Sequence, residues 1–207
     1  MGKRAGWLFV IEGIDGTGKS TQVAALAAWL RDQGWVVHER REPTQGPHGQ
    51  ALRASAATGR RSLDEELRLL ELDRRDHVRD VIRPALEAGE IVVLDRYYFS
   101  TAAYQGARGA DPSAIVAHHE TFAPRPDLTV VLDLDPEASR ARIARRGALD
   151  AFEDLENLRI CRDIFRSLLA RDVVLVDAAS SPEAVTEELV GLVRPLLSRG
   201  RGTDDSE

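Results

Sequence analysis

The sequence predicts an α/β fold, a three-layer sandwich in which helices cover both faces of a five-stranded parallel sheet. Five short apolar runs recur along the 207 residues, and longer helical stretches separate them. A glycine-rich turn joins the first run to the first helix, as happens at the start of many parallel sheets. This alternation of strand and helix favours a parallel sheet that is buried on both faces. The length suits one domain, so we expect a single unit over residues 1–207.

Each apolar run has the length of a strand. Charged residues interrupt the runs, so none is long enough for an apolar helix. The runs cover residues 8–11, 35–38, 91–94, 128–134 and 173–176. After the glycine-rich turn, Val23, Leu26, Ala27 and Leu30 share one face of a predicted helix that stops at Gly34.

Capping residues predict where the remaining helices begin. Ser62 and Glu65 form a capping box that opens a long helix, which ends at Gly89 and which Pro84 should kink or break near Arg83. Three further helices should each begin at a capping residue followed by proline. These pairs are Asp111-Pro112, Asp135-Pro136 and Ser181-Pro182.

Composition excludes several classes of protein. The net charge of −6 argues against a general nucleic-acid or membrane binder. The apolar runs are too short for a signal peptide or a membrane span, and the single cysteine, Cys161, suits a reducing compartment. We therefore expect a cytoplasmic protein in which Cys161 packs in a helix.

The glycine-rich turn carries the strongest functional signal. Residues 13–20 read Gly-Ile-Asp-Gly-Thr-Gly-Lys-Ser and match the phosphate-binding P-loop pattern in full. Backbone N–H groups of such a loop cradle phosphate oxygens at the positive end of a helix. Lys19 should reach the outer phosphates, and the Ser20 hydroxyl should ligate Mg²⁺. The fold is therefore expected to be that of a P-loop NTPase, and the ligand a nucleoside triphosphate.

Charged residues follow later strands, where ligands of parallel sheets gather. Asp95 ends the third apolar run and could hold Mg²⁺ opposite Ser20, while Arg96 could clamp a phosphate. Arg142, Arg145 and Arg146 fall on one face of a predicted helix. They could fold over the triphosphate, and a solvated helix face is the alternative.

Taken together, these stretches resemble the thymidylate kinase family of P-loop nucleoside monophosphate kinases. The resemblance covers roughly residues 7–195 and is most distinctive in Asp-Arg-Tyr-Tyr-Phe-Ser-Thr-Ala-Ala-Tyr-Gln-Gly at 95–106. Other matching stretches are residues 9–21, 41–43, 49–53, 73–74, 84–86 and 126–133.

The resemblance implies that ATP phosphorylates dTMP to dTDP, with Mg²⁺ as cofactor, in dTTP biosynthesis. It assigns to ATP binding residues Gly13, Ile14, Asp15, Gly16, Thr17, Gly18, Lys19, Ser20, Thr21 and Arg142. It assigns to dTMP binding residues Asp15, Arg41, Arg53, Leu70, Arg74, Arg96, Ser100, Thr101, Tyr104 and Gln105. It assigns catalysis to Lys19, Asp15, Arg96, Arg145 and Arg146, and the metal to Ser20 and Asp95.

The resemblance also implies a homodimer and a mobile lid at about residues 142–154. We expect the polar end of the chain, about residues 200–207, to be disordered. Gly16 and Thr17 stand where one subclass of the family has an arginine, so the lid should supply the catalytic cation.

Four departures from the family pattern keep alternatives open. Leu70 replaces a phenylalanine that stacks on thymine, and Phe165 replaces a tyrosine. The turn at 42–46 and the lid segment at 150–153 also differ. A dTMP kinase is the first hypothesis. A kinase for another nucleotide or nucleoside-like acceptor, and a nucleotide-binding module without turnover, are the alternatives.

Overall fold

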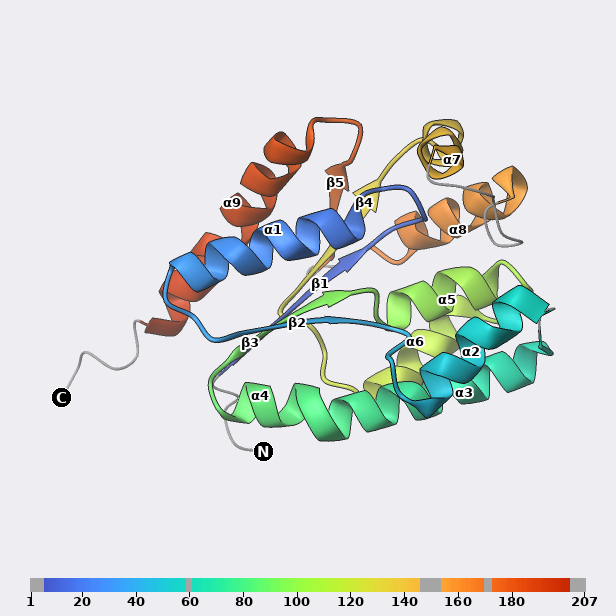
Figure 1. Cartoon of the computed structure of the whole chain (residues 1–207), viewed down its shortest axis with the longest axis horizontal. Coiled ribbons are helices and arrows are strands. Elements are labelled where there is room, and N and C mark those ends of the chain that lie inside the picture. The colour runs from blue at the N-terminus through green and yellow to red at the C-terminus, as the bar shows by residue number, and fades with distance from the viewer. Residues whose placement is uncertain (1–5, 59–60, 146–153, 170–172, 202–207) are drawn as a thin grey trace.

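The computed structural model describes residues 6–58, 61–145, 154–169 and 173–201. Five parallel strands form one sheet in the order β2-β3-β1-β4-β5 (Figure 1). The strands are β1 (Trp7–Glu12), β2 (Val37–Arg41), β3 (Ile91–Asp95), β4 (Leu128–Asp133) and β5 (Val173–Asp177). The predicted α/β architecture is confirmed.

Helices cover both faces of the sheet. Helices α1 (Lys19–Asp32) and α9 (Pro182–Arg201) pack on one face, and the other helices lie on the opposite side or beyond the strand ends (Figure 1). These are α2 (Pro47–Thr58), α3 (Leu63–His77), the π-helical η1 (Val78–Ile82), α4 (Arg83–Glu87), α5 (Tyr98–Gly106), α6 (Pro112–Glu120), α7 (Pro136–Ala144) and α8 (Leu155–Ser167).

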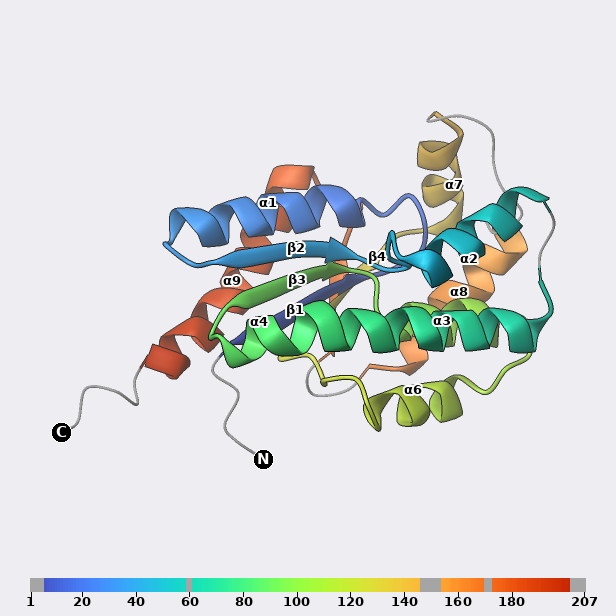
Figure 2. The ribbon, with the colours of Figure 1, turned by 60° about the horizontal axis from the view of Figure 1, so that its bottom comes forward.

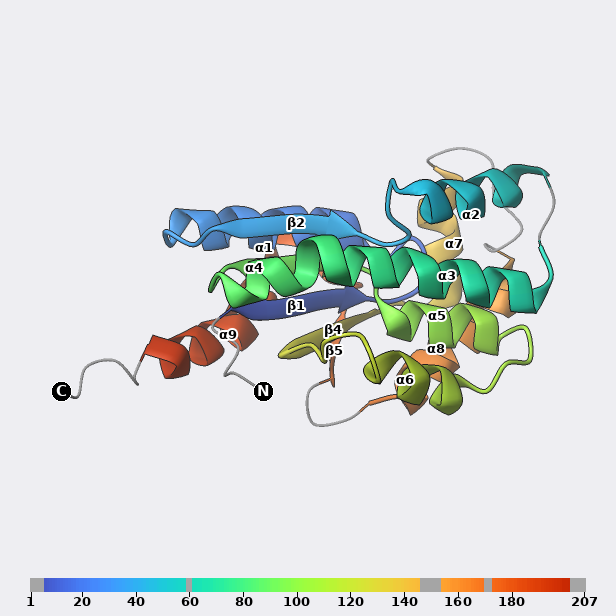
Figure 3. The same cartoon turned by 90° about the horizontal axis from the view of Figure 1, so that it is seen from below.

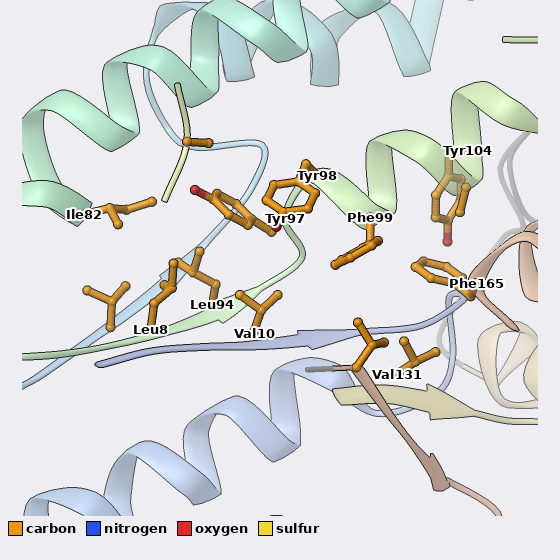
Figure 4. Close-up of a cluster of buried hydrophobic side chains, with 14 of the residues drawn as sticks. Leu8, Val10, Ile82, Leu94, Tyr97, Tyr98, Phe99, Tyr104, Val131 and Phe165 are labelled. Carbon is orange, nitrogen blue, oxygen red and sulfur yellow. The ribbon is translucent and has the colours of Figure 1, made fainter. Parts of the chain in front are cut away.

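Two hydrophobic cores result from the alternation of side chains along each strand. In β1, Leu8 and Val10 belong to the core beneath α4 and α5, which Figure 4 shows. Phe9 and Ile11 belong to the core beneath α1 and α9. All four side chains are almost completely buried, which explains the continuous apolar run in the sequence.

Capping residues open the helices where the sequence predicts. Ser62 accepts a hydrogen bond from the backbone N–H of Glu65 at 3.3 Å, and Ser181 accepts one from Ala184 at 3.2 Å. Asp111 and Asp135 cap α6 and α7 in the same way. Cys161 is buried in α8, as expected.

One expectation needs correction, and another takes an unexpected form. The second strand begins at Val37 rather than residue 35, because backbone pairing of this edge strand with β3 extends over β2 from Val37 to Arg41. Near Arg83, where Pro84 was expected to kink or break the helix, the α-helical geometry is interrupted but the chain stays helical. The five-residue π-helical turn η1 precedes Pro84, and the N–H of Arg83 bonds the carbonyl of Val78, so α3, η1 and α4 follow without a gap (Figure 3). The wider turn accommodates a ring that lacks an N–H.

The carboxyl ends of the strands share one edge of the sheet. In Figure 2 the arrowheads of β2 and β3 point toward the end of the molecule where α2, α7 and α8 lie. In sheets of this kind ligands bind beyond this edge. Helix α9 runs to Arg201, and residues 202–207, most of the expected tail, lie outside the described residues.

Candidate active site

The glycine-rich turn between β1 and α1 needs glycine for steric reasons. Gly13, Gly16 and Gly18 have φ angles of +132°, +80° and +95°, which side chains disfavour. A Cβ on Gly13 would lie 2.5 Å from the carbonyl oxygen of Leu132, and one on Gly16 would lie 2.6 Å from that of Ser139. The loop is therefore held closely against β4 and α7, at the start of a helix, where backbone N–H groups can bind a phosphate.

Lys19 lies at the centre of this loop. Its Nζ donates to the carbonyl oxygens of Gly13 at 3.0 Å and Ile14 at 2.8 Å, and lies 3.9 Å from Asp15 Oδ1. Burial, and then the nearby Arg96 guanidinium, lower the pKa of the Lys19 ammonium to about 8. The loop thus holds a positive charge beside the amides that would receive the outer phosphates.

Other residues of the motif contribute through the backbone. The Ile14 side chain is part of the hydrophobic core, and the Thr17 hydroxyl donates to the carbonyl of Ile14 at 2.9 Å. Both side chains face the protein, so only their main-chain groups can meet a nucleotide. Thr21 is exposed on α1.

Ser20 and Asp95 form a site with the donor set that Mg²⁺ prefers. The Ser20 hydroxyl donates to Asp95 Oδ2 at 2.5 Å, and Arg41 Nε lies 3.9 Å from the same oxygen. Asp95 Oδ1 is buried and has no hydrogen-bond partner among the described residues. A buried carboxylate oxygen without a partner is costly, and a cation would satisfy it. The described residues include no cluster of three metal-ligating side chains, so phosphate and water oxygens would complete the shell.

Asp15 joins the P-loop to a second set of charges. Its carboxylate forms an ion pair with Arg96 Nη2 and accepts a hydrogen bond from the Tyr104 hydroxyl at 2.7 Å. Burial alone would raise the pKa of Asp15, but Arg96 and Lys19 together hold it well below its usual range. Arg96 has a φ of +72°, a rare value for a side chain, and a hydrogen bond to Ser100 Oγ at 3.2 Å helps to hold it there.

Glu12 contacts the segment that carries Arg96, and the sequence did not single it out. It is completely buried at the end of β1, where Oε1 accepts from the backbone N–H groups of Tyr97 at 2.7 Å and Ser100 at 3.1 Å. Its Oε2 accepts from the Ser100 hydroxyl at 2.5 Å. Burial raises the pKa of Glu12 to about 7. This carboxyl fixes the turn that carries Arg96, and its one signal in the sequence is an acidic residue directly after an apolar run.

A cavity of about 340 Å³ opens next to Asp15, between the loop after β2 and the helices α2, α3 and α5. Its walls contain all ten residues that the family resemblance assigns to dTMP binding: Asp15, Arg41, Arg53, Leu70, Arg74, Arg96, Ser100, Thr101, Tyr104 and Gln105. They also contain Glu42, Pro43, Leu52, Ser55, Glu66 and Tyr97, which the sequence did not single out as ligands. The tertiary structure therefore brings together side chains from five separate segments.

Arg74 is held rigidly in the wall of this cavity. Its side chain is almost fully buried and pairs with Glu42, with Nε 2.8 Å and Nη2 2.7 Å from Oε2. Nη2 also donates to Thr101 Oγ1 at 3.1 Å, and Nη1 lies 3.1 Å from His119 Nδ1. Burial alone would raise the pKa of Glu42, but Arg74 and His77 keep it below its usual range.

Two of the five histidines, His77 and His119, have buried partners that the sequence did not indicate. His77 Nδ1 lies 2.9 Å from Glu42 Oε1, and both side chains are buried. His119 stacks on Tyr98, and burial together with Arg74 lowers the pKa of His119 to about 2, so it is neutral and can accept from Arg74. His118 is exposed. His77 and His119 thus support the network around Arg74.

Two further arginines stand at the mouth of the cavity. Arg41 is 62% exposed, and Arg53 donates to the carbonyl oxygens of Pro43 at 2.9 Å and Thr44 at 2.5 Å. Asp73 holds this turn by accepting from the backbone N–H of Thr44 at 2.7 Å and from its hydroxyl at 2.6 Å. The altered turn after β2 therefore has an anchor of its own and still positions Arg53.

Comparison with known proteins decides the family. The thymidylate kinase family model matches residues 11–189. The chain belongs to the thymidylate kinase family. It is 48% identical over 197 residues to the thymidylate kinase of Akkermansia muciniphila, which covers 95% of this chain and 94% of that protein. It is 48% identical to the protein of that name from Xanthomonas campestris pv. campestris (strain B100), covering 93% of this chain and 85% of the relative. For Xylella fastidiosa (strain M12) the identity is 46%, with 93% and 88% covered.

As a member of the thymidylate kinase family, the chain is an enzyme of the nucleoside monophosphate kinase class. Its P-loop carries Lys19, and the adjoining cavity is lined by four arginines, Arg41, Arg53, Arg74 and Arg96. Phosphoryl transfer depends on positioning and charge neutralisation, which explains why arginines reach this region from several loops.

The expected lid of this thymidylate kinase family member is described only in part. Helix α7 begins against the P-loop, where the Ser139 hydroxyl bonds the carbonyl oxygen of Asp15. Arg142 is half-buried in α7, and Arg145 is exposed at its end. Arg146 and the segment 150–153 lie outside the described residues.

The other departures from the family pattern have clear places. Leu70 lines the cavity, so the substitution for phenylalanine changes the cavity wall. Phe165 is buried in the core near Tyr104, as Figure 4 shows, so its missing hydroxyl changes the core rather than the cavity wall.

Proposed function

We propose that this chain catalyses the ATP-dependent phosphorylation of dTMP to dTDP, a step of dTTP biosynthesis, with Mg²⁺ as cofactor. One observation carries the proposal. A single cavity collects every residue expected to bind dTMP, and that cavity shares Asp15 with the P-loop. The donor and acceptor phosphates can therefore meet without a large rearrangement of the described core.

The charged side chains have distinct roles in this proposal. Lys19 and the loop amides hold the outer phosphates of ATP, and Arg41, Arg53 and Arg96 hold the phosphate of dTMP. Arg74 binds the base from its place in the buried network. The accepting phosphate is already ionised, so the reaction needs no strong general base.

Ser20 and Asp95 would hold Mg²⁺, which the unpartnered Asp95 oxygen supports. When bound, the ion neutralises charge on the phosphate oxygens. Arg145 or Arg146 would supply the catalytic cation, because the P-loop has no arginine of its own. Arg142 would assist ATP binding from α7.

Leu70 favours a second candidate function. A leucine in the cavity wall provides no aromatic stacking, so a different nucleotide or nucleoside-like acceptor could be preferred. The phosphoryl-transfer groups would be unchanged in that case.

We also propose that the enzyme works as a cytoplasmic homodimer. The family resemblance supports the dimer, and the buried thiol of Cys161 suits a reducing compartment. None of the helices in the described part of the chain has the length and apolar character needed to cross a bilayer.

The test is a coupled ADP-release assay with ATP, Mg²⁺ and dTMP, dUMP, UMP, dCMP, dGMP or thymidine as acceptor. Strong preference for dTMP is the expected result, and Lys19→Ala should abolish turnover while circular dichroism shows an intact fold. Preference for another acceptor would favour the second function. ATP binding without turnover on any acceptor would instead indicate a nucleotide-binding module.

A further inference from the structure

Glu66 is a buried carboxylate in the wall of the acceptor cavity, and no role has been assigned to it so far. It lies in the first turn of α3 and is 3% exposed. Its Oε2 accepts a hydrogen bond from Gln105 Nε2 at 3.1 Å and forms an ion pair with Arg108. Burying a carboxylate is costly unless it is paired, so its position beside the cavity needs an explanation.

The contact determines the orientation of the Gln105 amide. A carboxylate oxygen paired with an arginine acts as a hydrogen-bond acceptor, so the atom of Gln105 that faces it must be the NH₂ group. The amide oxygen Oε1 then points away from Glu66. Oε1 has no partner within the described ranges, and Gln105 lines the cavity, so this oxygen is the group that the amide can offer to a bound base.

Arg108 prevents the carboxylate from turning away. Its Nη1 pairs with Glu66, and its Nη2 donates to the backbone carbonyl of Arg61 at 3.0 Å, just before α3 begins. The guanidinium is thus held at two points and fixes the oxygen that Gln105 contacts.

The cavity consequently presents a donor and an acceptor in fixed positions. Arg74 offers N–H groups only, and the oriented Gln105 offers Oε1. Thymine and uracil carry an acceptor at O4 and a donor at N3–H, which match this pair. Cytosine carries the reverse pattern, with a donor at N4 and an acceptor at N3.

We propose that Glu66, held by Arg108, is a positioning residue that fixes the Gln105 amide and makes the cavity select bases with O4 and N3–H over cytosine. The inference rests on the proposed function, because it places the base of the acceptor beside Gln105. Glu66 itself touches neither the reacting atoms nor the phosphates.

The experiment compares kcat/KM for dTMP and dCMP in the full-length enzyme. Glu66→Gln retains the size of the side chain but can present either an oxygen or an NH₂ group to Gln105. The preference for dTMP over dCMP should fall roughly 10- to 100-fold, because a freely turning amide no longer penalises cytosine. Glu65→Gln is the matched control. Glu65 precedes Glu66 on the same helix, is 53% exposed and pairs with Arg61, so its replacement should leave the preference unchanged.

A double-mutant cycle separates positioning from a general structural role. In a Gln105→Ala background, Glu66→Gln should produce no further loss of preference, because the amide that it orients is gone. If Glu66→Gln does not fold, Arg108→Gln is the second variant. It releases the carboxylate at a partly exposed position and should reduce the preference in the same direction.

The failures of the two proposals are distinguishable. A wild-type enzyme that prefers dTMP, together with folded Glu66 and Arg108 variants that retain that preference within twofold, would overturn the role of Glu66 and leave the dTMP kinase function intact. A wild-type enzyme without preference for dTMP over dCMP would overturn both.

Discussion

The hydroxyl of Ser20 lies 2.5 Å from Asp95 Oδ2, although the two residues are 75 positions apart in the sequence. Ser20 lies in the first turn of α1, and Asp95 ends the strand next to β1. The second carboxylate oxygen of Asp95 is buried without a partner in the described structure. The start of α1 and the end of β3 thus place the Ser20 hydroxyl beside a carboxylate whose second oxygen has no partner among the described residues.

Removing the charge of Asp95 should impair the use of Mg²⁺. We expect Asp95→Asn to lower kcat/KM by about 100-fold or more and to raise the Mg²⁺ concentration needed for half-maximal rate, because a neutral amide binds the ion weakly. Steady-state assays across a Mg²⁺ titration measure both effects. Asp80→Asn removes the same negative charge at a position that is 56% exposed. It should leave kcat/KM and the Mg²⁺ requirement unchanged. An unchanged Mg²⁺ requirement in Asp95→Asn would rule out this carboxylate as a ligand.

The lid arginines should act mainly on the chemical step. Replacing Arg145 and Arg146 together with alanine should lower kcat far more than it raises the KM for ATP, because a cation that meets developing charge stabilises the transition state. Initial rates over a range of ATP concentrations separate the two parameters. Arg140→Ala removes an arginine at an exposed position of α7 and is the control. A higher KM with normal kcat would mean that these arginines serve ATP binding alone.

An aromatic side chain at position 70 should strengthen acceptor binding. Leu70→Phe is expected to lower the dissociation constant for dTMP by roughly 2- to 10-fold, because stacking on the base adds about 0.5–1.5 kcal/mol. Isothermal titration calorimetry with dTMP gives this constant directly. Leu69→Phe adds the same ring at the preceding position, which does not line the cavity, and should have no such effect. Equal binding by wild type and Leu70→Phe would place the base away from Leu70.

Glu12 should make stability depend on pH in the acidic range. Its pKa is about 7 in the folded protein, against an ordinary value of 4.5. Between these values the unfolded chain has lost the proton while the folded protein retains it, so stability falls as the pH rises. The loss across this window is at most about 3 kcal/mol for this group.

Urea unfolding of wild type and Glu12→Gln at pH 4.5 and pH 8 tests this sign. The amide is neutral at both pH values, so the variant should gain stability relative to wild type as the pH rises. Glu87→Gln changes an exposed carboxyl and provides the baseline. A constant difference between wild type and Glu12→Gln at the two pH values would show that Glu12 does not titrate in this range.

Local signals predicted most of the architecture. Apolar runs placed the strands, and capping residues such as Ser62 and Asp135 placed helix starts, because both depend on interactions within a few residues. The predicted bounds of the edge strand β2 differ from the observed ones, because the limits of this strand depend on pairing with β3 rather than on its own apolar content. The effect of Pro84 was located correctly near Arg83, but its form, a π-helical turn, depends on how the whole helix responds to the missing N–H.

The sequence by itself determined the phosphate-binding loop, the parallel sheet and the family, because these depend on contiguous residues whose spacing is diagnostic. Only the tertiary structure decided which ionisable side chains are buried and which partners they have. Glu12, Glu42, Glu66 and His119 look like ordinary surface residues when read along the chain. They acquire roles because the fold brings Tyr97, Arg74 and Gln105 against them in a medium that excludes water. In such a medium an unpaired charge is costly, so each buried group must find its partner, and that partner lies far away in the sequence.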